Sequence, residues 1–189
     1  YFKVAGTFAY LFEPNVYGPE QSIGSYQTPI SKLLIGNFDG DSNNQPDILA
    51  RTSAGVYLIS NQTQNGIKPF TTNFQGLPQT IDQLAVAKIA GQNRPDVLLS
   101  SEFNKNIYFI IFDEKNQVYQ NQPSYQLGNP VQIFTTADLD HDGSDELIVV
   151  LRYTVPSNTS AILVFTKTTS GWSRMPQTAV LANTQFSAL

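Results

Sequence analysis

The sequence predicts an all-β protein, and three observations support that prediction. Its apolar segments are short, rich in β-branched and aromatic residues, and bounded by Gly, Pro, Asn and Asp, as in a chain of short strands and tight turns. Tyr and Phe number 9 and 12, whereas charged residues make up only 14%, a composition that suits strands with a polar, weakly charged surface. Similar stretches also recur about every 50 residues, which is typical of repeat architectures.

Three stretches carry the repeat: NFDGDSNNQPDILAR from Asn37, AKIAGQNRPDVLLSS from Ala87 and TADLDHDGSDELIVV from Thr136. Each contains a short apolar strand, a polar loop, an acidic residue and a second apolar strand. The acids that close the loops are Asp47, Asp96 and Glu146, spaced 49 and 50 residues apart. Loops at this spacing predict equivalent places in successive structural units.

Further strands complete each unit. Third strands are expected at 54–60, 106–112 and 160–166, and fourth strands near 71–74, 124–127 and 174–180. Four-stranded units of about 50 residues stacked around an axis make a β-propeller, and parallel β-helices usually have much shorter repeats. We therefore expect one propeller domain over residues 1–189, covering almost four repeat lengths. It is either a fragment of a larger ring, completed by further repeats or another copy, or a closed four-bladed ring.

The third loop is the most acidic part of the chain. Five of the 15 acidic residues fall within the nine positions from Asp138 to Glu146. Gly143, at position six, permits the positive φ of a tight turn. The expected ligand set is Asp138, Asp140, Asp142, Ser144 (through a carbonyl) and Glu146. Clustered carboxylates repel one another unless a cation neutralises them, and an oxygen-only set favours Ca²⁺ over zinc or copper.

The first loop has the same spacing when it is counted from Asp39. The expected ligand set there is Asp39, Asp41, Asn43, Gln45 and Asp47. Asn44 stands where the third loop has glycine, and Asn tolerates the left-handed conformation. This set has one carboxylate fewer, so we expect weaker Ca²⁺ binding than in the third loop.

The middle loop, 88–96, lacks such a set. Positions one, three and five hold Lys88, Ala90 and Gln92, and only Asp96 remains at position nine. We expect this loop to hold no metal, so that the chain binds two Ca²⁺ ions in total. The Lys88 ammonium is expected to take the cation's place beside Asp96, because a lone buried carboxylate is costly. A solvated lysine without a partner is the alternative.

Turn formation alone and an EF-hand are the alternatives to a shared ligand role for the acidic loops. Asp, Asn and Gly favour turns for structural reasons, but two loops with matched spacing favour ligand binding. An EF-hand is excluded because position twelve is Ala50 or Val149, and because strands rather than helices are expected after the loops.

Loop spacing and repeat length together resemble the calcium loops of FG-GAP (VCBS-type) repeats, found in integrin α-subunit propellers and in many bacterial secreted proteins. The resemblance covers essentially the whole chain. The residues that match the family's ligand positions are Asp39, Asp41, Asn43, Asp47, Asp138, Asp140, Asp142 and Glu146. Glu146 departs from the family's usual Asp, and the Phe-Gly and Gly-Ala-Pro signatures are not clearly present. The resemblance implies an extracellular propeller, secreted or at the cell surface, that serves adhesion, ligand binding or scaffolding.

The amino-acid composition limits the kinds of partner that we expect. The 11 Lys and Arg residues against 15 Asp and Glu give a net charge of −4, and no basic run could follow a phosphate backbone, so we do not expect nucleic acid. The apolar runs are far shorter than a membrane helix requires, so we expect no insertion by this segment. Cysteine is absent, which excludes disulfides and thiolate metal sites. A protein or glycan ligand at a cell surface or matrix is the expected partner.

Two functions other than a calcium-dependent binding module are compatible with the sequence. One is the propeller part, catalytic or not, of a secreted polysaccharide-active enzyme, although no catalytic constellation is found and the single histidine, His141, lies between calcium ligands. The other is a lectin, in which Trp172 and the many tyrosines stack on sugar rings. The N-glycosylation sequons at Asn61 and Asn158 are relevant only if the protein is secreted by a eukaryotic cell.

Overall fold

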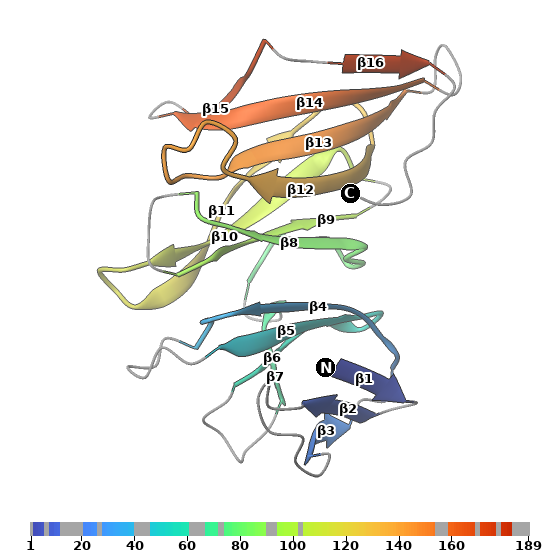
Figure 1. Cartoon of the computed structure of the whole chain (residues 1–189), viewed down its shortest axis with the longest axis vertical. Coiled ribbons are helices and arrows are strands. Elements are labelled where there is room, and N and C mark those ends of the chain that lie inside the picture. The colour runs from blue at the N-terminus through green and yellow to red at the C-terminus, as the bar shows by residue number, and fades with distance from the viewer. Residues whose placement is uncertain are drawn as a thin grey trace. The chain divides into compact units, whose positions relative to one another are not determined.

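The computed structural model shows an all-β protein, so the prediction of an all-β chain is confirmed (Figure 1). It describes residues 2–5, 8–11, 21–25, 28–39, 46–60, 67–71, 74–89, 94–101, 104–153, 159–168, 171–176 and 179–182. Within these ranges, no helix is long and apolar enough to cross a membrane. The chain divides into two compact units, Tyr1–Asn73 and Phe74–Leu189.

The first unit contains two antiparallel sheets. One is formed, in chain order, by β1 (Phe2–Ala5), β2 (Phe8–Leu11) and β3 (Gln21–Ser25). The other is formed, again in chain order, by β4 (Ile30–Gly36), β5 (Asp47–Thr52), β6 (Gly55–Ile59) and β7 (Ile67–Pro69). Ile48 and Ala50 of β5 and Ile59 of β6 form a small buried cluster on one face of the second sheet.

The second unit also contains two antiparallel sheets. The first is formed by β8 (Gln83–Ala87), β9 (Asp96–Ser100), β10 (Asn106–Asp113) and β11 (Val118–Gln126). The second is formed by β12 (Val131–Ala137), β13 (Glu146–Tyr153), β14 (Thr159–Thr168) and β15 (Gly171–Arg174), with β16 (Ala179–Ala182) also paired to β14.

Three of the four sheets share one plan, in which four consecutive strands pair in chain order. In each, the second strand begins with the acid expected to close the preceding loop, and that acid pairs with the last residue of the first strand. The three pairs are Gly36 with Asp47, Ala87 with Asp96 and Ala137 with Glu146. The loops between first and second strands therefore occupy equivalent places in the three sheets.

The third strands lie where the sequence predicts them, at β6, β10 and β14, but the fourth strands begin earlier. β7 ends at Pro69, before the expected 71–74, and β15 begins at Gly171 rather than Arg174. β11 begins at Val118, directly after a turn in which Gln117 has a φ of 56°. It is mostly exposed, as an edge strand is. Its apolar pattern is therefore too weak to mark where the strand starts.

The two sheets of the second unit pack face to face through a common core (Figure 1). Its buried members come from β8, β9 and β10 on one side and from β12, β13 and β14 on the other, including Leu98, Phe109, Phe134, Leu147, Val149 and Phe165. Val97, Leu98 and Leu99 of β9 are all 0% exposed. Successive strand residues face opposite sides, so β9 is buried on both faces.

One side chain links the two sheets through the backbone. Gln83 on β8 donates from Nε2 to the Gln132 carbonyl (2.5 Å), and its Oε1 accepts from the Phe134 N–H (3.0 Å). Gln132 is the extra residue of a bulge in β12, where the register shifts between Val131 and Ile133. The amide therefore satisfies two backbone groups of the neighbouring sheet.

We expect Gln83→Ala to lower the free energy of unfolding by about 1–3 kcal/mol, because it removes both hydrogen bonds between the Gln83 side chain and the backbone of β12. Urea denaturation followed by circular dichroism would measure the loss. Gln126→Ala is the matched control, since Gln126 is exposed on β11 and should change stability by less than about 0.5 kcal/mol. Equal losses of stability in the two variants would contradict a stabilising role for the Gln83 hydrogen bonds.

Candidate functional site

A buried carboxylate closes each of the three equivalent loops. Asp47, Asp96 and Glu146 are 1%, 0% and 1% exposed. Each accepts a hydrogen bond from the second residue after the end of the first strand: Phe38 N–H to Asp47 (2.7 Å), Ile89 N–H to Asp96 (3.1 Å) and Leu139 N–H to Glu146 (2.8 Å). The closing acid thus holds the start of its loop against the start of the second strand.

This register changes the alignment of the first loop. Phe38 and Leu139 make equivalent bonds, so Asn37 corresponds to Asp138, and Asp39 corresponds to Asp140. Counting from Asp39 as position one is therefore wrong by two residues, because the first loop is two residues longer than the third. Spacing alone missed Asn37 as a candidate ligand, and the shared acid-to-backbone bond identifies it.

The third loop brings three of its predicted ligands together. Carboxylate oxygens of Asp138, Asp140 and Glu146 all lie within 4.8 Å of one another. Oxygens on opposite sides of a Ca²⁺ ion lie about 5 Å apart, since each Ca²⁺–O distance is about 2.3–2.6 Å. The three carboxylates could therefore hold a metal cation.

The rest of the loop is folded around these carboxylates by its own backbone. Asp138 accepts from the N–H groups of Asp142 (3.1 Å) and Gly143 (3.1 Å), and the Asp142 N–H also lies 3.2 Å from Asp140 Oδ1. His141 and Gly143 have φ of 62° and 91°. The predicted positive φ at Gly143 is confirmed. His141 also adopts this uncommon conformation and is exposed.

One predicted carboxylate ligand of the third loop, Asp142, lies outside the group of three carboxylates. The Asp142 carboxylate accepts from the Ser144 N–H (2.8 Å) and so closes a local turn.

In the first loop, Asp41, Asn43 and Gln45 lie outside the described residues. Asp39 is exposed, accepts a hydrogen bond from the Ser60 hydroxyl, and donates its own N–H to Asp47 (2.9 Å). The described part of this loop thus holds Asn37, Asp39 and Asp47.

The middle loop satisfies its closing acid without a cation. Asp96 accepts from the Ile89 N–H and from the Phe112 N–H of β10 (3.0 Å). Burial raises the pKa of Asp96 to about 6, although these two bonds act in the opposite direction. Among the described residues Lys88 is not a partner of this carboxylate, and its side chain is exposed. The expectation that the Lys88 ammonium replaces a cation beside Asp96 is therefore wrong, because backbone donors already occupy the carboxylate.

Asp145 also fixes the position of the third loop, although the loop spacing does not identify it as a site residue. Its carboxylate accepts from the Lys88 N–H (2.7 Å), and its own N–H donates to the Lys88 carbonyl (2.9 Å). The residue before the closing acid of the third loop is thereby bonded to the end of β8 in the neighbouring sheet. The equivalent residues of the other two loops, Pro46 and Pro95, have no N–H to donate.

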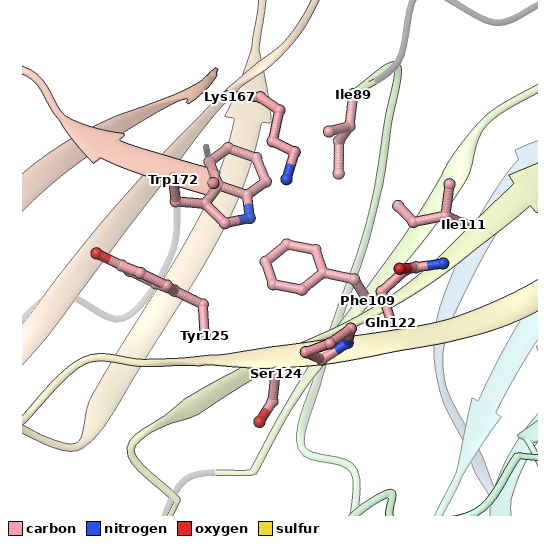
Figure 2. A pocket seen from close by; sticks show the side chains of 10 residues that line it. Ile89, Phe109, Ile111, Gln122, Ser124, Tyr125, Lys167 and Trp172 are labelled. Atoms are coloured by element: carbon pink, nitrogen blue, oxygen red, sulfur yellow. The ribbon is translucent and has the colours of Figure 1, made fainter. Parts of the chain in front are cut away.

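A second candidate region is a pocket of about 760 Å³ in the second unit (Figure 2). It is lined by Ile89, Phe109, Ile111, Gln122, Pro123, Ser124, Tyr125, Lys167, Gly171 and Trp172. Trp172 is half-buried and stacks on Phe109, with ring centroids 5.2 Å apart and an interplanar angle of 20°. The indole is thus a wall of this pocket rather than a free stacking platform.

Comparison of the chain with protein-family models finds no match, and comparison with curated proteins finds none either. A function must therefore be inferred from the geometry of the chain's own residues.

We expect Asp96→Asn to flatten the dependence of stability on pH between about 4 and 6. The folded pKa of about 6 lies above the value of the unfolded chain. The folded state therefore binds more protons in this window, and stability falls as pH rises, by on the order of 2 kcal/mol. Denaturation in chelator across this range, with wild type and variant compared, measures the difference in slope.

Asp113→Asn is the control with the opposite sign. Hydrogen bonds from the Asn116 side chain and backbone lower the pKa of Asp113. This exposed carboxylate therefore adds stability as pH rises, and its loss should steepen the fall. Identical slopes for wild type and Asp96→Asn would contradict a raised pKa at Asp96.

Proposed function

We propose that this chain is an extracellular calcium-binding β-propeller module of the FG-GAP (VCBS) type, or a part of one, that serves adhesion, ligand binding or scaffolding. The observation that carries the proposal is the cluster of Asp138, Asp140 and Glu146, which lies between the first and second strands of a four-stranded sheet. That is where the resemblance to FG-GAP repeats puts the calcium loop.

The shared frame of the three four-stranded sheets supports the propeller. Each has the same strand order, and in each a buried acid starts the second strand and binds the backbone of the loop before it. The central strand β9 is also buried on both faces, as an inner strand of a blade between two neighbours would be. Further repeats or another copy of the chain would complete the ring.

In this proposal calcium acts as a structural clamp rather than a reactant. Asp138, Asp140 and Glu146 would hold the ion, Asp142 and a carbonyl near Ser144 would complete its coordination, and Glu146 would tie it to the buried start of β13. The first loop would hold a second ion through Asn37, Asp39, Asp41 and Asp47. The loop 88–96 would hold none, since Lys88, Ala90 and Gln92 stand where the third loop has carboxylates. The partner would be a protein or glycan bound by the rigid loops.

We expect Ca²⁺ to raise the melting temperature, because an ion that binds only the folded state adds about 2.7 kcal/mol at a hundred times its Kd. For a chain of this size that corresponds to roughly 5–10 °C. Scanning calorimetry in calcium and in chelator measures the shift. Asp140→Ala should remove a large part of it, whereas Glu114→Ala, an exposed acid at the β10–β11 turn, should leave it unchanged. A melting temperature that is the same with calcium and with chelator would refute the metal site.

The revised alignment of the first loop gives a matched pair of variants. We expect Asn37→Ala to weaken one of two Ca²⁺ sites by tenfold or more, because the register puts Asn37 at the place of Asp138. Asn43→Ala, which counting from Asp39 would select, should weaken it less. Isothermal titration calorimetry with both variants decides between the alignments. A larger loss in Asn43→Ala would favour the simple count.

A further inference from the structure

We propose that the pocket of the second unit binds a small organic carboxylate with a flat apolar body, such as an arylalkanoate. None of the proposed calcium ligands lines this pocket. Its floor is apolar: Phe109 and Ile89 are 3% and 5% exposed, and Ile111 lies beside them (Figure 2). The volume of about 760 Å³ lies within the range of small-molecule sites. Such a floor favours an apolar group that excludes water.

The charged group of the lining is a cation, Lys167, and the lining also contains side chains that can both donate and accept, on Gln122, Ser124 and Tyr125. The Lys167 amine lies 5.6 Å from the centroid of the Trp172 ring, and Figure 2 shows the amine and the indole nitrogen projecting over Phe109 from the same side. An ammonium and an indole N–H can donate hydrogen bonds but cannot accept them. In the described part of the chain, neither group has a hydrogen-bond acceptor or a carboxylate partner, and the pocket lining contains no acidic residue. An anionic acceptor complements such a pair.

The positive charge of Lys167 favours an acid over a neutral sugar. A sugar ring would also need a free indole face for stacking, and one face of the indole is already covered by Phe109. A carboxylate placed at Lys167 and Trp172 would accept from both donors, and its ring would lie against Phe109 and Ile111. The ammonium contributes a charge-assisted bond, which is stronger than a neutral one. Lys167 is therefore the residue that selects acid over alcohol.

The shape of the pocket is set by the edge strands that border it. In β11, the register with β10 shifts between Ile107 and Phe109, so that Pro123 and Ser124 form a bulge opposite Tyr108. Bulges re-aim the side chains beside them, and here Gln122 and Tyr125 both line the pocket. On the other side, Lys167 and Trp172 are cross-strand partners on β14 and β15. The two donors are therefore held together by a strand pair.

The chain reports binding by itself, because Trp172 is its only tryptophan. Titration with 3-phenylpropionate, 3-phenylpropanol and 3-phenylpropylamine, with excitation at about 295 nm where these phenyl ligands do not absorb, follows the pocket directly. We expect saturable change with the acid, at least threefold weaker binding of the alcohol, and the weakest binding of the amine. Equal affinity for acid and alcohol, or no saturable change with any of the three, would overturn the proposal.

Three variants separate the contribution of the Lys167 charge to binding from that of the apolar pocket floor. Lys167→Gln should abolish the preference for acid over alcohol, and Lys167→Arg should retain it. Ile111→Ala should weaken acid and alcohol alike. As a control, Lys115→Gln, at an exposed lysine outside the pocket lining, should change nothing. Far-UV circular dichroism confirms that each variant is folded. Retention of the acid preference in Lys167→Gln would refute the role of the ammonium, and tight binding of neutral disaccharides without binding of the acid would favour a sugar site instead.

Discussion

A buried carboxylate at the start of the second strand is the feature on which each of the three equivalent loops depends. Burying a charge is costly unless it is hydrogen-bonded or paired, so the loop before it must supply donors. In every case the first donor is the N–H two residues beyond the end of the first strand. That bond fixes where the loop leaves the sheet. It also makes the loops comparable although their lengths differ.

The same carboxylate is satisfied in two different ways. Asp96 binds two backbone N–H groups, and its raised pKa shows that burial still outweighs them. Glu146 lies instead within reach of Asp138 and Asp140, where more negative charge is added rather than removed. Such a cluster is favourable only when something positive or several donors face it. The N–H groups of Asp142 and Gly143 donate to Asp138 and compensate part of the negative charge. In our proposal, calcium compensates the rest.

Much of this arrangement could be predicted from the sequence, and the failures have physical causes. Short β-branched segments between turn residues mark the second and third strands, because these strands are buried and must be apolar. Among the fourth strands, β11 and β15 have mixed exposure, so their starts are poorly marked. Spacing found the acids, but it misaligned Asn37 and Asp39 because a count of residues does not reveal an insertion. Lys88 was misassigned because backbone donors, which the sequence does not display, had already satisfied Asp96. The pocket at Trp172 depends on the packing of two sheets and has no local signature.

The end of β8 joins features that are distant in the sequence. The Lys88 N–H donates to the Asp145 carboxylate of the acidic loop, and the Asp145 N–H donates to the Lys88 carbonyl. The next residue, Ile89, donates its N–H to the buried Asp96 and places its side chain in the floor of the pocket. Asp145 directly precedes Glu146, so an ion held by Glu146 would restrict Asp145 and through it Lys88. The loop without a cation set of its own is thus anchored by the neighbour that has one. Its anchored end supplies a wall of the site to which we assign a ligand.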